Sequence, residues 1–165
     1  VPDVTRKWRL PPSEGDQWNF EFPFTVSGHE VLGLSVFLIG YFDSYSEESV
    51  GTFYTEGASL DRVETEHGEG YDISMTIGLA PFDLGVSQYV VFRAEPEAEH
   101  NIYVITLQIR RLSGEDSSWR RVNQRFINVI RKQFLIWRTV GPEIKDDYRV
   151  QGEELLARKQ AEAKT

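Results

Sequence analysis

Polar and apolar residues alternate along residues 17–26, and a period of two is typical of a half-buried strand. The residues expected on its apolar side are Trp18, Phe20, Phe22, Phe24 and Val26. Pro23 has no N–H to donate, so this strand should lie at a sheet edge or have its ladder broken there. The apolar run Val31 to Phe42 is rich in branched and aromatic residues, which favours a buried strand, although periodicity does not separate a buried strand from a buried helix.

Short apolar segments separated by turn residues continue to residue 113. A polar loop is expected from Phe42 to Glu48, followed by two short strands, Val50 to Tyr54 and Leu60 to Thr65, around a turn at Glu56-Gly57. The sequence HGEG at residues 67–70 predicts a turn into an alternating strand over 71–80, and residues 86–93 and 102–111 predict two more strands. Sequential strands with short turns predict an antiparallel meander.

From Ser117 the apolar period changes to 3.6, which predicts a long amphipathic helix from Ser117 to Val140 that ends at Gly141-Pro142. A shorter helix, Glu153 to Ala163, is charged all round and is expected to be exposed or docked on a partner. The residues on the apolar side of the long helix are Trp119, Val122, Phe126, Val129, Ile130, Gln133, Trp137 and Val140. The predicted fold class is α+β, an antiparallel meander covered on one face by a long C-terminal amphipathic helix.

The length of 165 residues and the 40% hydrophobic content predict one packed domain. We expect an extended N-terminal segment over 1–16, the α+β domain over 17–141, and a linker with a charged terminal helix over 142–165. The absence of cysteine excludes disulfides, thiolate zinc sites and a cysteine nucleophile. The longest uncharged apolar run, at 31–42, is shorter than the roughly 20 residues of a membrane-spanning helix. A start at Val1 and a polar opening lead us to expect missing flanking segments.

The sequence contains no recognisable catalytic motif, so we predict a protein that is not an enzyme and binds no cofactor. Its three histidines, His29, His67 and His100, have neither HExxH spacing nor a GxSxG neighbour. Carboxylates and one imidazole gather around residue 67 and could hold a divalent cation, but a solvated acidic hairpin is the interpretation we favour. The residues of this cluster are Glu64, Glu66, His67, Glu69 and Asp72.

Charge is distributed unevenly along the chain. Residues 1–100 carry 5 basic and 18 acidic side chains, whereas residues 101–140 carry 8 and 2, within a total net charge of −8. No acid occurs from Ser117 to Val140. The basic residues expected opposite the apolar side of this helix are Arg120, Arg121, Arg125, Arg131, Lys132 and Arg138. These arginines either pair with acids of the same domain or meet an anionic partner.

The leading functional hypothesis is a non-catalytic interaction domain of a membrane-associated assembly that docks through this basic helix face. Its partner would be an acidic protein or an anionic membrane surface, with the chain peripheral or excised from a membrane protein on the cytoplasmic side. Nucleic acid is not expected, because a pI of 4.9 implies repulsion of phosphate. The alternative is a small apolar ligand held between sheet and long helix. Its pocket would be lined by Phe20, Phe22, Phe24, Phe126, Ile130 and Trp137.

Overall fold

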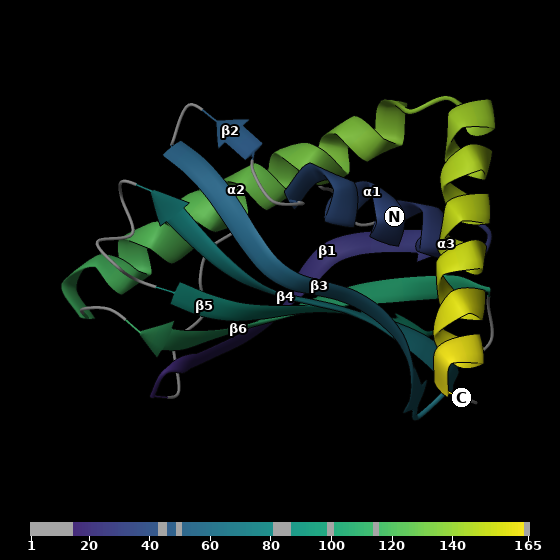
Figure 1. Ribbon diagram of the computed structural model, residues 1–165, viewed down its shortest axis with the longest axis horizontal. Helices are drawn as coiled ribbons and strands as arrows, with labels where there is room; N and C mark the ends of the chain where they lie inside the picture. Colours follow the sequence, from purple (N-terminus) through teal and green to yellow (C-terminus); the bar gives the residue numbers. More distant parts are fainter. Residues whose placement is uncertain are drawn as a thin grey trace.

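The computed structural model describes residues 15–42, 46–48, 51–80, 87–98, 101–113 and 116–163. The elements follow the chain as β1 (Gln17–Ser27), α1 (Val31–Phe42), β2 (Ser46–Glu48), β3 (Gly51–Thr65), β4 (Gly68–Ala80), β5 (Ser87–Pro96), β6 (Ile102–Ser113), α2 (Asp116–Thr139) and α3 (Pro142–Ala163). The sheet is bent, α1 and α2 lie on its concave side, and α3 stands across one end (Figure 1). The predicted α+β class is confirmed.

The six strands form one antiparallel sheet in the order β1-β6-β5-β4-β3-β2. Strands β2 to β6 are neighbours in chain order, which confirms the meander, and β1 joins it beside β6 at the edge. The β1–β6 register shifts between Glu21 and Thr25, around Pro23. Both expectations for this proline, an edge strand and a broken ladder, are therefore confirmed. Alternate residues of β4 are buried as predicted, at Ile73, Met75 and Ile77.

The prediction of a strand for Val31 to Phe42 is wrong, because this run is helix α1. The helix starts after a turn in which the Glu30 N–H donates to the Ser27 carbonyl, and the Leu34 N–H then donates to the Glu30 carbonyl at 2.9 Å. Apolar side chains lie on every side of this helix, which suits its position because other elements cover it on several sides. Leu34 and Leu38 are buried in the common core, and the Phe37 ring lies 5.4 Å from that of Trp137 on α2.

The two short strands predicted around Glu56-Gly57 are one strand, β3. Gly57 has φ 65°, and the β3–β4 register shifts between Glu56 and Ser59. A glycine at positive φ accommodates extra residues in a bulge, so the chain continues in the same direction without turning. Part of the expected polar loop before it pairs with β3 as the short edge strand β2.

The long helix predicted at Ser117 is confirmed as α2, and its core-facing residues Phe126, Ile130 and Trp137 are at most 1% exposed. The side chains of Trp119 and Val122 lie outside the part that the structure describes. Residues 142–152, expected as a linker, instead form the first half of α3. The sequence did not predict a helix over these residues, because α3 is mostly polar and its buried residues are only Gly152 and Leu156. No helix within the described ranges is long and apolar enough to cross a membrane. Residues 1–14 of the expected N-terminal segment lie outside the description.

Candidate functional site

The predicted basic face lies on the side of α2 that turns away from the core. Asn123, Phe126, Ile130 and Trp137 mark the buried arc of the helix, and all six basic residues fall on the remaining arc by the helical period. Arg120, Lys132 and Arg138 are exposed, and Arg125 and Arg131 are partly exposed. Arg121 lies within the helix, but its side chain is outside the described residues. We call these six residues the basic face.

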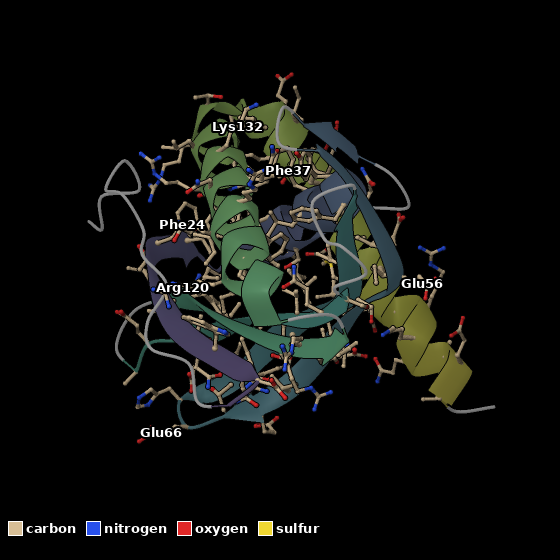
Figure 2. All side chains as sticks on the ribbon, turned by 90° about the vertical axis from the view of Figure 1, so that its left-hand side faces the viewer. Phe24, Phe37, Glu56, Glu66, Arg120 and Lys132 are labelled. Atoms are coloured by element: carbon tan, nitrogen blue, oxygen red, sulfur yellow. The ribbon has the colours of Figure 1, made fainter. Side chains whose placement is uncertain are left out.

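The helical period divides the basic face into two rows. Arg120, Arg131 and Arg138, separated by 11 and 7 residues, lie along the side next to β1. The Arg120 guanidinium carbon is 5.3 Å from the centroid of the Trp18 ring, and that of Arg138 is 4.6 Å from the Phe24 ring. Figure 2 shows Arg120 and Phe24 between α2 and the edge strand. We call this row the inner row. These cation–π contacts hold two of its three residues against β1.

The outer row consists of Arg121, Arg125 and Lys132. It lies about a third of a turn further round the helix, away from β1. Ile136, one turn beyond Lys132, is 39% exposed beside this row. The outer row therefore combines cationic residues with an exposed branched residue, a combination that suits a docking surface.

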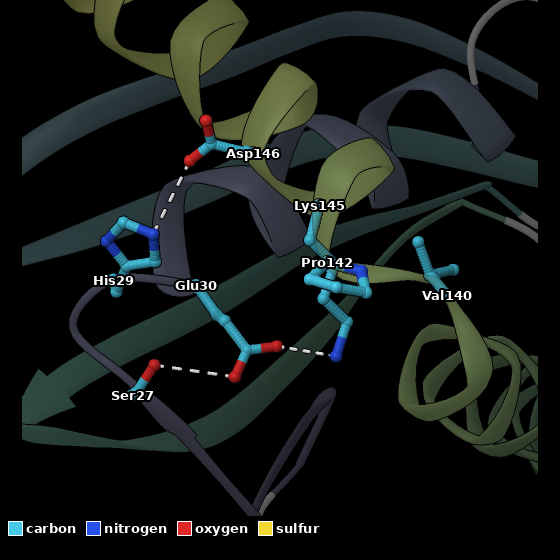
Figure 3. A pocket seen from close by; sticks show the side chains of 7 residues that line it. All are labelled: Ser27, His29, Glu30, Val140, Pro142, Lys145 and Asp146. Atoms are coloured by element: carbon cyan, nitrogen blue, oxygen red, sulfur yellow. Dashed lines mark hydrogen bonds and ion pairs between the residues drawn. The ribbon is translucent and has the colours of Figure 1, made fainter.

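A cavity of about 310 Å³ lies where the β1–α1 connection meets the α2–α3 corner. Its lining is shown in Figure 3 and consists of Ser27, His29, Glu30, Val140, Pro142, Lys145 and Asp146. The Lys145 ammonium is 2.7 Å from Glu30 Oε1, and the Ser27 hydroxyl donates to Glu30 Oε2 at 3.4 Å. The sequence pattern does not indicate this cavity, because its two walls are more than 100 residues apart in the chain.

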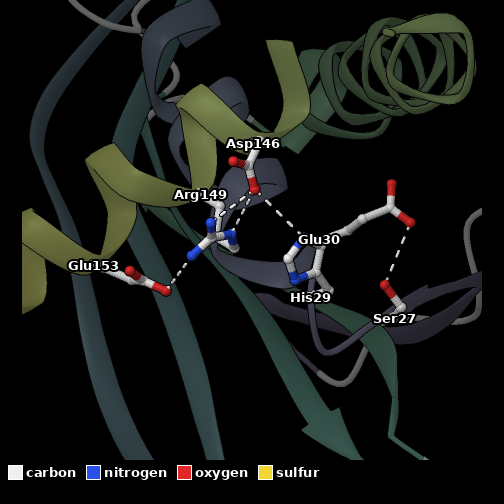
Figure 4. A network of polar contacts seen from close by, with 6 residues as sticks. All are labelled: Ser27, His29, Glu30, Asp146, Arg149 and Glu153. Carbon is white, nitrogen blue, oxygen red and sulfur yellow. Dashed lines mark hydrogen bonds and ion pairs between the residues drawn. The ribbon is translucent and has the colours of Figure 1, made fainter. Parts of the chain in front are cut away.

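His29, at the mouth of this cavity, belongs to an ion-pair network on α3. Its Nε2 lies 3.4 Å from Asp146 Oδ1, and Arg149 contacts Asp146 at 2.7 Å and Glu153 at 2.8 Å (Figure 4). The hydrogen bonds from Arg149 lower the pKa of Asp146. Because the Ser27 hydroxyl donates to Glu30 rather than to His29, these residues lack the nucleophile–base hydrogen bond of acyl-transfer sites. The network joins α3 to the start of α1.

The acidic cluster around residue 67 lies at the β3–β4 hairpin. Arg62 contacts Glu69 at 3.1 Å, and Arg93 donates to both carboxylate oxygens of Asp72 at 2.8 Å. Glu64, Glu66 and His67 are exposed. Within the ranges that the structure describes, no group of three or more His, Asp or Glu residues could hold a metal ion. His100 lies outside these ranges.

Four of the six residues proposed to line an apolar ligand pocket take part in the core. Phe24, Phe126, Ile130 and Trp137 are each at most 1% exposed. The Phe24 ring lies 4.6 Å from Phe134, and the Phe126 ring lies 5.6 Å from Phe42. The side chains of Phe20 and Phe22 lie outside the described residues. Ligand binding between sheet and α2 stays a prediction.

Comparison of the chain with models of protein families, with curated proteins and with solved structures gave no match. The fold and the site therefore define this protein only as an α+β domain with a basic face on its longest helix.

Proposed function

We propose that this chain is a non-catalytic interaction domain of a membrane-associated assembly, and that it docks through the basic face of α2 onto an anionic partner. The observation that supports this proposal is the separation of charges on α2. Over residues 117–140 the helix has no acidic residue, and all six basic residues lie on the arc away from the core. The one acid of α2 is its first residue, Asp116, so from Ser117 onward no counter-charge on this helix reduces the attraction that the arc exerts on an anionic surface.

The overall charge makes a local docking surface necessary. A chain with net charge −8 repels anionic partners on average, so attraction must come from a region where cations are concentrated. At physiological ionic strength charges interact over about 8 Å. A partner seated on α2 would thus respond mainly to the basic face and little to the acidic hairpin at the far end of the sheet.

Binding to two anionic probes tests the proposal. The probes are vesicles of phosphatidylcholine with phosphatidylserine, which represent an anionic leaflet, and immobilised polyglutamate, which represents an acidic protein. We expect the purified chain to bind at least one of them at low salt and to dissociate as salt rises. Each basic residue near an acidic leaflet contributes about 1 kcal/mol, so the triple variant Arg121→Glu, Arg125→Glu, Lys132→Glu should bind at least about a hundredfold more weakly.

The matched control exchanges the same three positions for the other basic residue, Arg121→Lys, Arg125→Lys and Lys132→Arg. This control keeps the charge and should retain binding. Binding to neutral phosphatidylcholine vesicles should be absent in all three proteins. If the triple Glu variant folds like the wild type and binds each probe as tightly as the wild type does, the basic face is only a solvated surface and the proposal is wrong.

A further inference from the structure

We infer that the anionic surface recognised by the outer row is present on the protein itself, on α3 of a second copy of the chain. The inference rests on the proposed function and names its partner. The surface consists of Glu143, Asp147 and Glu154, which we call the acidic row. All three side chains are exposed on α3.

The acidic row differs from the other charges of α3 in having no counter-ion. Lys145 pairs with Glu30, Arg149 pairs with Asp146 and Glu153, and Lys159 pairs with Asp61 at 2.6 Å. These contacts join other charges of α3 to each other, to the turn before α1 or to β3. Among the described residues, none forms an ion pair or side-chain hydrogen bond with the three acids of the acidic row. They remain available to cations from outside the molecule.

The two rows have the same spacing along their helices. The outer row is spaced by 4 and 7 residues, at 121, 125 and 132, and the acidic row is spaced by 4 and 7, at 143, 147 and 154. Each row therefore follows one side of its helix for about 16 Å. Two helices laid side by side in parallel would bring each cation opposite a carboxylate. Arg158, exposed one turn beyond Glu154, ends the acidic row at its C-terminal side.

One molecule does not bring its own two rows together. Helices α2 and α3 meet at Gly141 and diverge at a steep angle (Figure 1), and the acids of the acidic row have no partner in the described part of the chain. In a head-to-tail arrangement of copies, however, α2 of one molecule could lie parallel to α3 of the next. Each row also has an exposed branched residue beside it, Ile136 at 39% and Val150 at 40%, and the pairing would cover both.

Sedimentation velocity at low ionic strength, over a range of protein concentrations, tests the inference by charge exchange. Variant B reverses the outer row with Arg121→Glu, Arg125→Glu and Lys132→Glu, and variant A reverses the acidic row with Glu143→Lys, Asp147→Lys and Glu154→Lys. We expect the wild-type sedimentation coefficient to rise with concentration, and the rise to shrink as salt is added. Variants A and B should each lose the rise, because like charges then face each other, and an equimolar mixture should recover it.

Two control variants separate row pairing from effects of total charge. Variant A changes the net charge from −8 to −2, which by itself favours association. A control with Glu56→Lys, Glu66→Lys and Glu97→Lys makes the same change at exposed positions outside α3 and should associate at least as well as the wild type. A chain that carries both the A and the B changes keeps the net charge of −8 and should self-associate like the wild type.

The possible failures are distinguishable. A wild-type protein that stays monomeric at all concentrations, or a variant A that associates as the wild type does, overturns the inference. In either case the proposed function survives if variant B still loses binding to the vesicles or to polyglutamate. If variant B binds these probes normally, the proposed function fails instead. Recovery in the mixture, with loss in each variant alone, supports both.

Discussion

Gly152 of α3 lies so close to Leu32 of α1 that a Cβ added at Gly152 would lie 2.9 Å from the Cβ of Leu32 and 3.0 Å from its carbonyl oxygen. On the facing helix, a Cβ added at Gly33 would lie 3.0 Å from the Lys145 carbonyl oxygen. The two helices therefore cross with their backbones nearly in contact. This crossing fixes α3, and with it the acidic row, relative to the rest of the domain.

Gly152→Ala should reduce the free energy of unfolding by about 1 to 3 kcal/mol, because the added methyl group must push backbone rather than a flexible side chain. The matched control is Gly40→Ala in α1, where a Cβ would meet nothing within 4 Å. That change should raise stability by about 0.5 to 1 kcal/mol, since alanine favours helix more than glycine does. Chemical denaturation measures both, and a stabilising Gly152→Ala would mean that the helices are not in close contact.

Trp137→Ala should reduce the free energy of unfolding by about 3 to 5 kcal/mol, the usual cost of removing a large core aromatic. The Trp137 ring is 1% exposed and lies 5.4 Å from Phe37 and 6.1 Å from Tyr148, so it joins α2 to both other helices. Thermal and urea denaturation test this. An unchanged melting temperature would show that α2 is not docked as described.

Lys159→Met should raise the pKa of Asp61 towards its ordinary value of 3.8. The hydrogen bond from Lys159 is the main cause that holds this pKa below that value, and Lys159 also donates to Ser59. A carboxyl whose pKa is lower in the folded state stabilises above its unfolded pKa and loses this effect as pH falls through the folded value. The Lys159–Asp61 ion pair between α3 and β3 should therefore stabilise the fold less below about pH 4.

NMR titration of the Asp61 carboxyl in both proteins measures this effect. Asp146 serves as the internal reference, because its pKa is lowered by Arg149 and not by Lys159. If the Asp61 pKa is the same with and without Lys159, the contact does not exist in solution.

Gln88→Met should raise the free energy of unfolding by about 1 to 3 kcal/mol, because a buried amide without hydrogen bonds costs about that much. Gln88 is 0% exposed, and within the described part of the chain neither its Oε1 nor its Nε2 has a partner. As a control, Gln108→Met on the next strand removes an amide that donates to Asn19 at 2.9 Å and should give no gain. A destabilised Gln88→Met protein would show that this amide is bonded in solution.

Local structure can be predicted from the sequence wherever a periodic pattern meets a clear boundary. The sequence alone predicts the alternation in β4 and the edge position of β1 with its proline. It also predicts the 3.6 period of α2 up to Gly141. The basic face could also be predicted, because the helical period determines which residues of one helix share a side. Each of these features depends on residues a few positions apart.

Features that depend on contacts between distant segments are evident only in the folded chain. Val31 to Phe42 forms a helix that other elements cover on several sides, and an apolar run covered in this way has no period that separates a helix from a strand. The first half of α3 was missed because its packing uses the absence of a side chain at Gly152 instead of an apolar stripe. The cavity near His29 and the contact of one arginine row with β1 likewise required the fold. Burial and close approach are properties of segments brought together in space, and a local pattern does not contain them.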